Sequence, residues 1–192
     1  MMRVVPLSDR GMAAECEPLL GGDGSVRLQD LTACARFGLK GPGADTWFAS
    51  QGDLPEINRW TQRAGARLLR LGARDLMILA EPDRPETVDA IRATWEAWGQ
   101  GHSSWREETW ASLRLTGPAV WDVAARLTAV DLRRKAFASD AILQTRFAHL
   151  DAVLLRASPA SDAGLDILFD IAATAQVVHD IASAIRRHGR FG

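Results

Sequence analysis

The sequence predicts an α+β fold built from two related units, each with a strand, a helix, further strands and a closing helix. Short segments alternate apolar and polar residues, as half-buried strands do. Longer segments at 83–98 and 173–187 repeat apolar residues at helical spacing. Residues 35–48 align without a gap on residues 111–124, so Gly41-Pro42 matches Gly117-Pro118 at an offset of 76 residues. Two such units can form one mostly antiparallel sheet with helices packed on it.

The composition is that of a globular protein rather than a nucleic-acid or membrane binder. Of 192 residues, 47% are hydrophobic and 24% charged, and the net charge is −1. We therefore expect neither nucleic acid nor a membrane as a partner. The longest apolar stretch of the later chain, Leu76–Ala80, is too short to span a bilayer. Cys16 and Cys34 are too few and too far apart for a disulfide framework, which predicts a cytoplasmic protein.

We expect residues 1–24 to form an N-terminal arm, because they are rich in turn formers and lack a clear period. Residues 25–192 then form a single two-lobed domain with pseudo-repeats at about 25–100 and 101–188. In the first repeat, strands are expected around 26–28 and 35–39, a hairpin at 68–71 and 75–80, and a helix at 83–98. The segment 54–64 remains open between helix and strand, because Pro55 and Gly65 interrupt its helical spacing.

The second repeat is expected to follow the same order. A strand at 110–116 leads into a helix at 118–130, whose inward residues are Val120, Val123, Ala124 and Leu127. Further strands are expected around 142–148, 152–156 and 165–171, before a final helix at 173–187. That helix places Arg186 and Arg187 at its negative end.

No residue pattern announces catalysis, so we expect no catalytic, cofactor-binding or metal-binding residues in this chain. The four histidines have no partner at metal-ligand spacing, and there is no Gly-x-Ser-x-Gly elbow. "GGDG" at 21–24 lacks the strand that precedes a dinucleotide-binding loop. The sequence alone brings no two of its scattered aspartates together as an acid–base pair. The histidines considered are residues 102, 149, 179 and 188, and the aspartates considered are residues 30, 75, 122, 131 and 140.

Seven tryptophans occur without a tyrosine, and four of them cluster between the two repeats, at 95, 98, 105 and 110. Core packing is the expected role for most of them. One or two at a subunit interface would be reasonable, because tryptophan supplies a large contact area at low entropy cost.

The segment Trp105–Arg156 resembles the gamma subunit of heterotetrameric sarcosine oxidase. In that family a strand ends in a glycine before a helix, and Asp-Leu, a basic pair, Ala-Phe and a Gln-Thr strand follow. These features stand here as Gly117, Asp131-Leu132, Arg133-Arg134, Ala136-Phe137 and Gln144-Thr145. The hairpin Leu71–Ala80 is similar to the family's Leu-Gly-Pro-Asp-Glu-Trp-Leu-Leu hairpin, with Ala73 for proline and Leu76 for tryptophan.

Two departures from related patterns matter. The family commonly opens its last helix with Arg-Ser, whereas this chain has Ala172, Ala173 and Thr174 there. The wider relatives are folate-binding aminomethyltransferases and an iron–sulfur-assembly protein. The Lys-Gly-Cys-x-x-Gly-Gln-Glu signature of the latter is missing, because no cysteine follows Cys34. No residue is therefore assigned to folate.

The resemblance implies a fold like the folate-binding domain of aminomethyltransferases, and a non-catalytic accessory role. Family enzymes oxidatively demethylate sarcosine to glycine and pass the one-carbon unit to tetrahydrofolate. FAD, FMN, NAD and tetrahydrofolate would then be held by partners, the alpha, beta and delta subunits, and no cofactor by this chain. The alternatives are a stand-alone folate-binding or aminomethyl-transferring enzyme, and an α/β protein with an unrelated partner.

Overall fold

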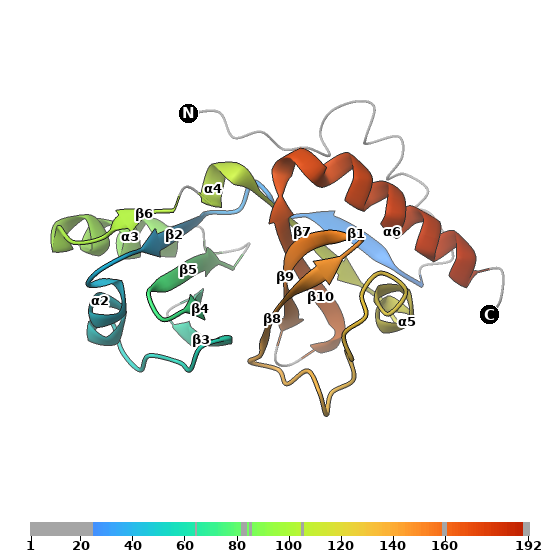
Figure 1. Ribbon diagram of the computed structural model, residues 1–192, viewed down its shortest axis with the longest axis horizontal. Helices are drawn as coiled ribbons and strands as arrows, with labels where there is room; N and C mark the ends of the chain where they lie inside the picture. Colours follow the sequence, from blue (N-terminus) through green and yellow to red (C-terminus); the bar gives the residue numbers. More distant parts are fainter. Residues whose placement is uncertain are drawn as a thin grey trace. The chain divides into compact units, whose positions relative to one another are not determined.

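A computed structural model describes residues 25–63, 65–81, 84, 86–104, 106–158 and 161–189. The expected arm at 1–24 lies outside the described residues. The described residues divide into two compact units, one formed by 25–33 together with those from Trp110 onward, the other by Cys34–Thr109. Each unit contains one antiparallel sheet of five strands (Figure 1).

The unit Cys34–Thr109 places its strands in the order β3-β4-β5-β2-β6. Helices α2 and α3 pack on this sheet through a core that includes Phe37, Trp47, Ile78 and Trp95. Trp47 and Trp95 meet edge to face with ring centroids 5.2 Å apart. The elements are β2 (Arg36–Lys40), α2 (Ala44–Ser50), β3 (Arg59–Arg63), β4 (Ala66–Gly72), β5 (Asp75–Ala80), α3 (Glu86–Trp98), β6 (His102–Ser103) and α4 (Arg106–Thr109).

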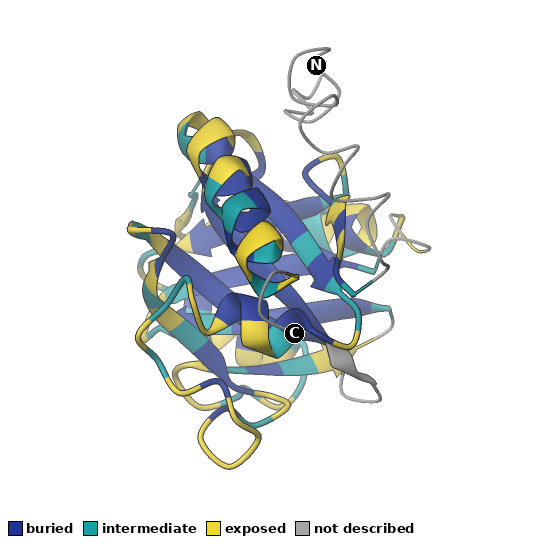
Figure 2. Ribbon diagram, turned by 90° about the vertical axis from the view of Figure 1, so that its right-hand side faces the viewer, coloured by how far each residue is buried: buried dark blue, intermediate teal, exposed yellow. Residues whose placement is uncertain are grey.

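The other unit places its strands in the order β1-β7-β10-β9-β8. Helices α5 and α6 share one apolar core with this sheet, and α6 buries Val177, Val178 and Ile181 in it. Figure 2 shows the resulting stripe of buried positions along α6. The elements are β1 (Arg27–Asp30), β7 (Trp110–Thr116), α5 (Val120–Ala124), β8 (Ile142–Phe147), β9 (Leu150–Ser158), β10 (Ser161–Asp170), the 3-10 turn η2 (Ile171–Ala173) and α6 (Thr174–His188).

The two units repeat the same topology, which confirms the predicted fold class. The order β2-α2-β3-β4-β5-α3 matches β7-α5-β8-β9-β10-α6, and corresponding strands occupy corresponding places in the two sheets. The strands form two sheets rather than the single layer expected from sequence. β1 pairs with β7, and β6 pairs with β2. The sides of β7 and β2 that could have joined the two repeats into one sheet are therefore already hydrogen-bonded. Residues 25–33 accordingly lie in the unit of the second repeat.

The matching Gly-Pro pairs mark a turn that needs glycine in both units. Gly41 and Gly117 have positive φ values of 96° and 122°, which residues with a Cβ rarely adopt. At Gly117 an added Cβ would stand 2.4 Å from the backbone oxygen of Ser25, just before β1. The amide of Ala119 in turn donates to that oxygen at 3.0 Å. The turn therefore fastens the entry of β1 to the exit of β7.

Most element boundaries agree with the sequence-based predictions, but the predicted extent of one helix is wrong. The structure has a helix only over Val120–Ala124, where 118–130 was expected. The chain tightens after it, because Leu127 donates to Ala124 rather than to the residue four positions back. The carbonyl of Leu127 then accepts the amide of Ala148 at 2.8 Å, so it cannot extend the helix. The open segment at 54–64 contains β3, which begins at Arg59.

Candidate functional site

A hollow of about 720 Å³ lies at one end of the sheet that contains β7, β8, β9 and β10. The strand register assembles it: Asp170 of β10 stands opposite Trp110 of β7, and Arg146 of β8 stands opposite Asp151 of β9. Its lining residues are Trp110, Gln144, Thr145, Arg146, Leu150, Asp151, Ala152, Val153, Leu168, Phe169, Asp170 and Ala173.

Arg146 and Asp170, two of the charged residues that line this hollow, are exposed and hydrogen-bonded to nearby backbone. Arg146 donates from Nη2 to the carbonyl of His149 at 2.8 Å. Asp170 accepts the amide of Ala172 at 2.9 Å and so caps η2. Val153, Leu168 and Phe169 are buried, which makes the wall apolar and the rim polar. Such a hollow can hold a partly apolar group, and among the described residues that line it the one hydroxyl is that of Thr145.

The start of α6 contributes to the same hollow. Where the resemblance leads one to expect Arg-Ser, Ala173 lines the hollow with a methyl group. Thr174 is buried, and its hydroxyl donates to the carbonyl of Ile171 at 2.6 Å. Thr174 therefore hydrogen-bonds within the first turn of α6, and neither Ala173 nor Thr174 offers a positive charge to a ligand.

Buried carboxylates of the described residues pair with arginine. On the sheet face opposite the helices, the guanidinium of Arg114 on β7 donates two hydrogen bonds, of 2.6 and 2.9 Å, to the carboxylate of Asp166 on β10. The Asp166 side chain is only 2% exposed, so its charge depends on this bidentate partner. The pair ties two central strands together and is structural.

The unit Cys34–Thr109 has a comparable ion pair with a different construction. Gly38 leaves room above β2, and Arg106 of α4 passes there to reach Asp75 of β5 with two hydrogen bonds. Lys40 lies 3.1 Å from the same carboxylate. Burial raises the pKa of Asp75, but the hydrogen bonds and positive charges of Arg106 and then Lys40 lower it by more, so the pKa lies below its usual value.

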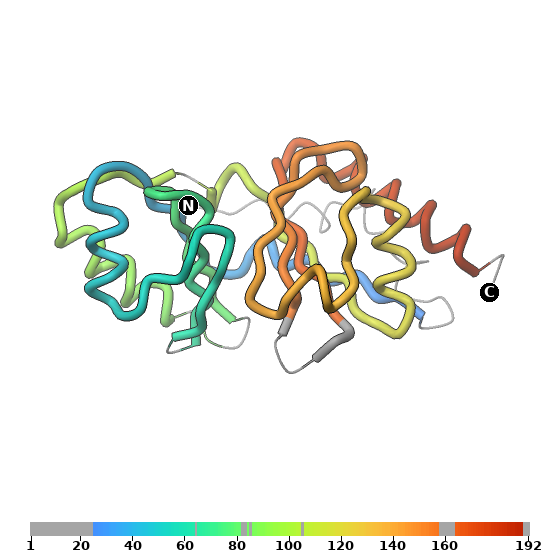
Figure 3. The backbone as a smooth tube through the Cα atoms, turned by 60° about the horizontal axis from the view of Figure 1, so that its bottom comes forward, coloured from blue at the N-terminus to red at the C-terminus, as the bar shows by residue number. Residues whose placement is uncertain are grey.

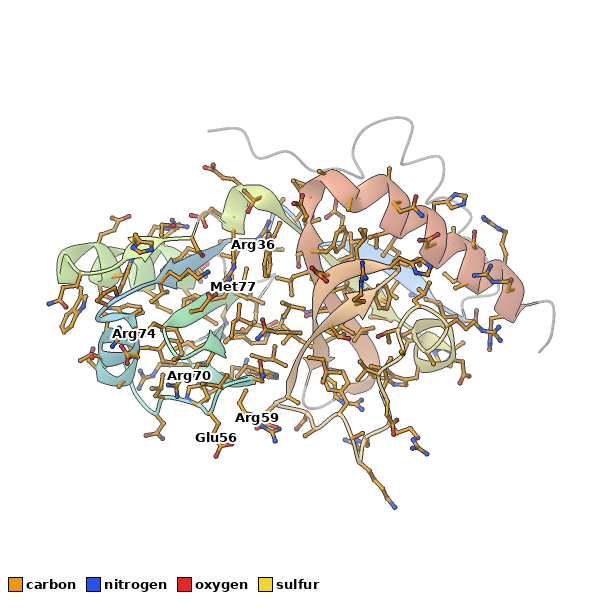
Figure 4. All side chains as sticks on the ribbon, viewed as in Figure 1. Arg36, Glu56, Arg59, Arg70, Arg74 and Met77 are labelled. Carbon is orange, nitrogen blue, oxygen red and sulfur yellow. The ribbon has the colours of Figure 1, made fainter. Side chains whose placement is uncertain are left out.

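A second arginine pair joins α3 to α4. Arg92 lies 3.0 Å from Glu107 and donates to the carbonyl of Arg36 at 3.1 Å, with its guanidinium over the ring of Phe37. Arg36 donates back to the carbonyl of Glu107 at 3.3 Å. On β4 of the same unit, Arg70 donates to the carbonyl of Pro55 at 3.0 Å and holds the segment before β3 (Figure 4). These arginines also stabilise the fold.

The motif 131–137, which carries the family resemblance, wraps around a buried arginine. Arg156 of β9 is 3% exposed and donates to the carbonyls of Phe137 and Leu132 at 2.8 and 3.1 Å. Its guanidinium stands 4.4 Å from the ring centre of Trp121 and 5.0 Å from that of Phe137. Figure 3 traces this segment, here called the anchored loop, between α5 and β8. Arg156 thus fixes the path of the loop.

A second hollow, of about 540 Å³, lies beside the anchored loop. Arg133 and Asp131 pair at its rim through three contacts between 2.6 and 3.0 Å, and these hydrogen bonds lower the pKa of Asp131 to about 2. The lining residues are Trp121, Asp122, Ala125, Val130, Asp131, Leu132, Arg133, Arg134 and Arg156. The wall combines apolar surface with arginine and aspartate side chains, and two of the arginines are already bound, Arg133 to Asp131 and Arg156 to backbone carbonyls.

Sequence reasoning missed this cluster because Trp121, the loop and Arg156 lie on separate elements. One signal was present: Ala152, Leu154 and Arg156 alternate along β9, and the first two face the core. A charged residue at the next inward position implies a buried partner.

The four histidines are spread over two elements and a turn. They lie in β6, in the β8–β9 turn, and in the middle and at the end of α6. Within the described ranges no group of three or more histidine, cysteine, aspartate or glutamate residues could hold a metal ion. Asp30 accepts the amide of Thr32 at 2.8 Å, a turn role. Cys34 is half-buried and Cys16 lies outside the described residues.

The tryptophans divide between core and surface. Trp47, Trp60 and Trp95 are buried, whereas Trp98 is 36% exposed. Trp105 lies outside the described residues. In the part of the chain that the structure describes, no helix is long and apolar enough to cross a membrane.

The two repeated α+β units are shared with two solved structures. The chain is similar to one in the structure of heterotetrameric sarcosine oxidase from Corynebacterium sp. U-96 in complex with pyrrole 2-carboxylate. That match has a TM-score of 0.74 and 20% sequence identity, and it covers 97% of this chain and 96% of that one. No family model and no curated protein matches the sequence.

A second solved structure shares the fold over part of its length. The glycine cleavage system aminomethyltransferase T from Bartonella henselae matches with a TM-score of 0.59 and 18% identity. The match covers 87% of this chain but 48% of that one, so the chain spans about half of the aminomethyltransferase.

Proposed function

We propose that this chain is the gamma subunit of a heterotetrameric sarcosine oxidase-type enzyme, and that it contributes structure rather than catalysis. The observation that carries the proposal is the end-to-end match, which covers 97% and 96% of the two chains and therefore implies nearly equal lengths. The match to the aminomethyltransferase is partial, because it covers only 48% of that chain.

The chemistry of the described residues supports a structural role. Arg114, Arg106 and Arg92 each neutralise a carboxylate that is buried or half-buried, and Arg156 holds backbone carbonyls. These arginine side chains stabilise the fold, and because they are already paired they are not available to bind a substrate. The alpha, beta and delta subunits would bind FAD, FMN, NAD and tetrahydrofolate, and the complex would demethylate an N-methyl amino acid in the cytoplasm.

The proposal is tested with purified chain and with the other three subunits. We expect the chain alone to show no flavin absorbance and no oxidation of sarcosine, and to co-purify with the tagged alpha subunit when all four are co-expressed. Oxidation of sarcosine by the chain alone would overturn the proposal, as would its absence from the purified complex.

The likeness to an aminomethyltransferase and the hollow at Trp110 favour one second candidate, a stand-alone folate-binding protein. Titration with tetrahydrofolate, followed by tryptophan fluorescence, separates the two. Micromolar binding corresponds to about −8 kcal/mol and gives a saturable change. If that change occurs and is reduced in Trp110→Phe, the second candidate stands. We expect a flat titration.

A further inference from the structure

The anchored loop is held rigidly while its tip remains exposed. Leu132 and Phe137 are buried at its two ends, and Arg156 binds the carbonyls of both. Between them Arg133, Arg134 and Lys135 are exposed. A loop fixed in this way loses little entropy when a partner binds to it.

The charge of this region is opposite to that of the whole chain. Residues 125–137 contain four basic residues and one acidic residue, whereas the chain carries −1 overall. The hollow beside the loop adds the indole of Trp121 and the apolar Val130 and Leu132 to the guanidinium groups. Arginine and tryptophan next to apolar surface are typical of the energetic centres of protein interfaces.

We propose that the anchored loop and its hollow form a docking socket for an acidic segment of a partner subunit. Arg134 and Lys135 meet the carboxylates of that segment, and Trp121 with Val130 accepts its apolar side chains. The inference rests on the proposed function, since it names the surface through which the chain joins its complex. A protein segment is favoured over nucleic acid, because the hollow offers the apolar surface of Trp121, Val130 and Leu132, and the net charge of −1 gives the chain no long-range attraction for a phosphate backbone.

The first experiment compares two charge reversals of equal size. Binding to an immobilised complex of the alpha, beta and delta subunits is measured for wild type, Arg134→Glu/Lys135→Glu and Arg186→Glu/Arg187→Glu. The control pair is exposed at the end of α6 in the same unit. We expect at least tenfold weaker binding for the loop variant, less than twofold for the control, and a weaker salt dependence in the loop variant. Urea unfolding confirms that both variants are folded.

The second experiment needs no substitution. Lys40 and Lys135 are the only lysines of the chain. Acetylation with an amine-reactive ester, quantified by mass spectrometry, should label Lys135 at least fivefold more slowly in the complex than in the free chain. The labelling of Lys40 reports on the rest of the surface.

The outcomes separate the two proposals. If wild type fails to bind the three subunits, the proposed function is wrong and so is the proposal of a docking socket. If wild type binds while the loop variant binds equally well and Lys135 labels equally fast, only the socket is wrong. Binding of a single-stranded oligonucleotide that the loop variant loses, with subunit binding unchanged, would identify a nucleic-acid site and overturn the inference.

Discussion

Arg156 organises its surroundings at the scale of a single residue. It enters the core on an apolar strand, yet its guanidinium is satisfied by two carbonyls and two aromatic rings. The motif 131–137 can be read from sequence, but its anchor cannot, because Arg156 lies 19 residues beyond Phe137. Only the fold shows that the buried residues of the motif serve packing while the basic ones face solvent.

Arg156→Lys should lower the free energy of unfolding by about 2 kcal/mol. An ammonium cannot reproduce the planar fork that reaches both carbonyls, and one buried carbonyl then loses its donor. Arg126→Lys, at an exposed position of the same region, should change it by less than about 0.5 kcal/mol. Urea midpoints of the three proteins measure the difference. Equal midpoints for both variants would contradict the anchoring role.

Asp75 should make stability depend on pH. Its pKa is lowered in the folded state, so its ion pairs stabilise the protein above the unfolded pKa, near 3.8, and this contribution is lost as pH falls below it. The difference in unfolding free energy between wild type and Asp75→Asn should therefore be largest at neutral pH and shrink from about pH 5 to pH 3. Urea unfolding across this range measures it. A constant difference would show that the charge of Asp75 does not matter.

At the scale of elements, the sequence predicts the bounds of the strands more accurately than those of helix α5. The strand β7 has the predicted bounds of 110–116, because Ala111, Leu113 and Leu115 alternate with polar residues and Gly117 ends it. Helix α5 stops at Ala124, because Leu127 bonds to Ala148. That contact joins residues from different elements, and no local pattern encodes it. The pairing of β1 with β7 is likewise non-local, since a whole unit lies between them in the chain.

Two glycines allow this non-local pairing to be tested. Gly117→Ala should cost about 2 kcal/mol or more, because it combines a positive φ with a clash at the backbone oxygen of Ser25. Gly99→Ala has a positive φ but meets no atom within 4 Å, so about 1 kcal/mol is expected. Amide exchange should in addition show faster exchange in β1 for the first variant alone. Equal costs and unchanged exchange would argue against the fastening of β1 at this turn.

At the scale of the whole molecule, the 76-residue repeat could be recognised from two Gly-Pro turns, and the resemblance extended it to a fold. The division into two sheets could not be predicted, because it depends on which strand takes each outer edge. Neither could the hollows, whose lining residues come from several strands or loops. The proposed role in assembly rests on the repeated scaffold, its structural ion pairs and the exposed loop.

Native mass spectrometry of the four co-expressed subunits tests this account most directly. We expect one copy of this chain in an assembly with the alpha, beta and delta subunits, and a bare polypeptide mass when the chain is released from it. A chain that never enters the assembly, or one that is released with its own flavin or folate bound, would contradict the account.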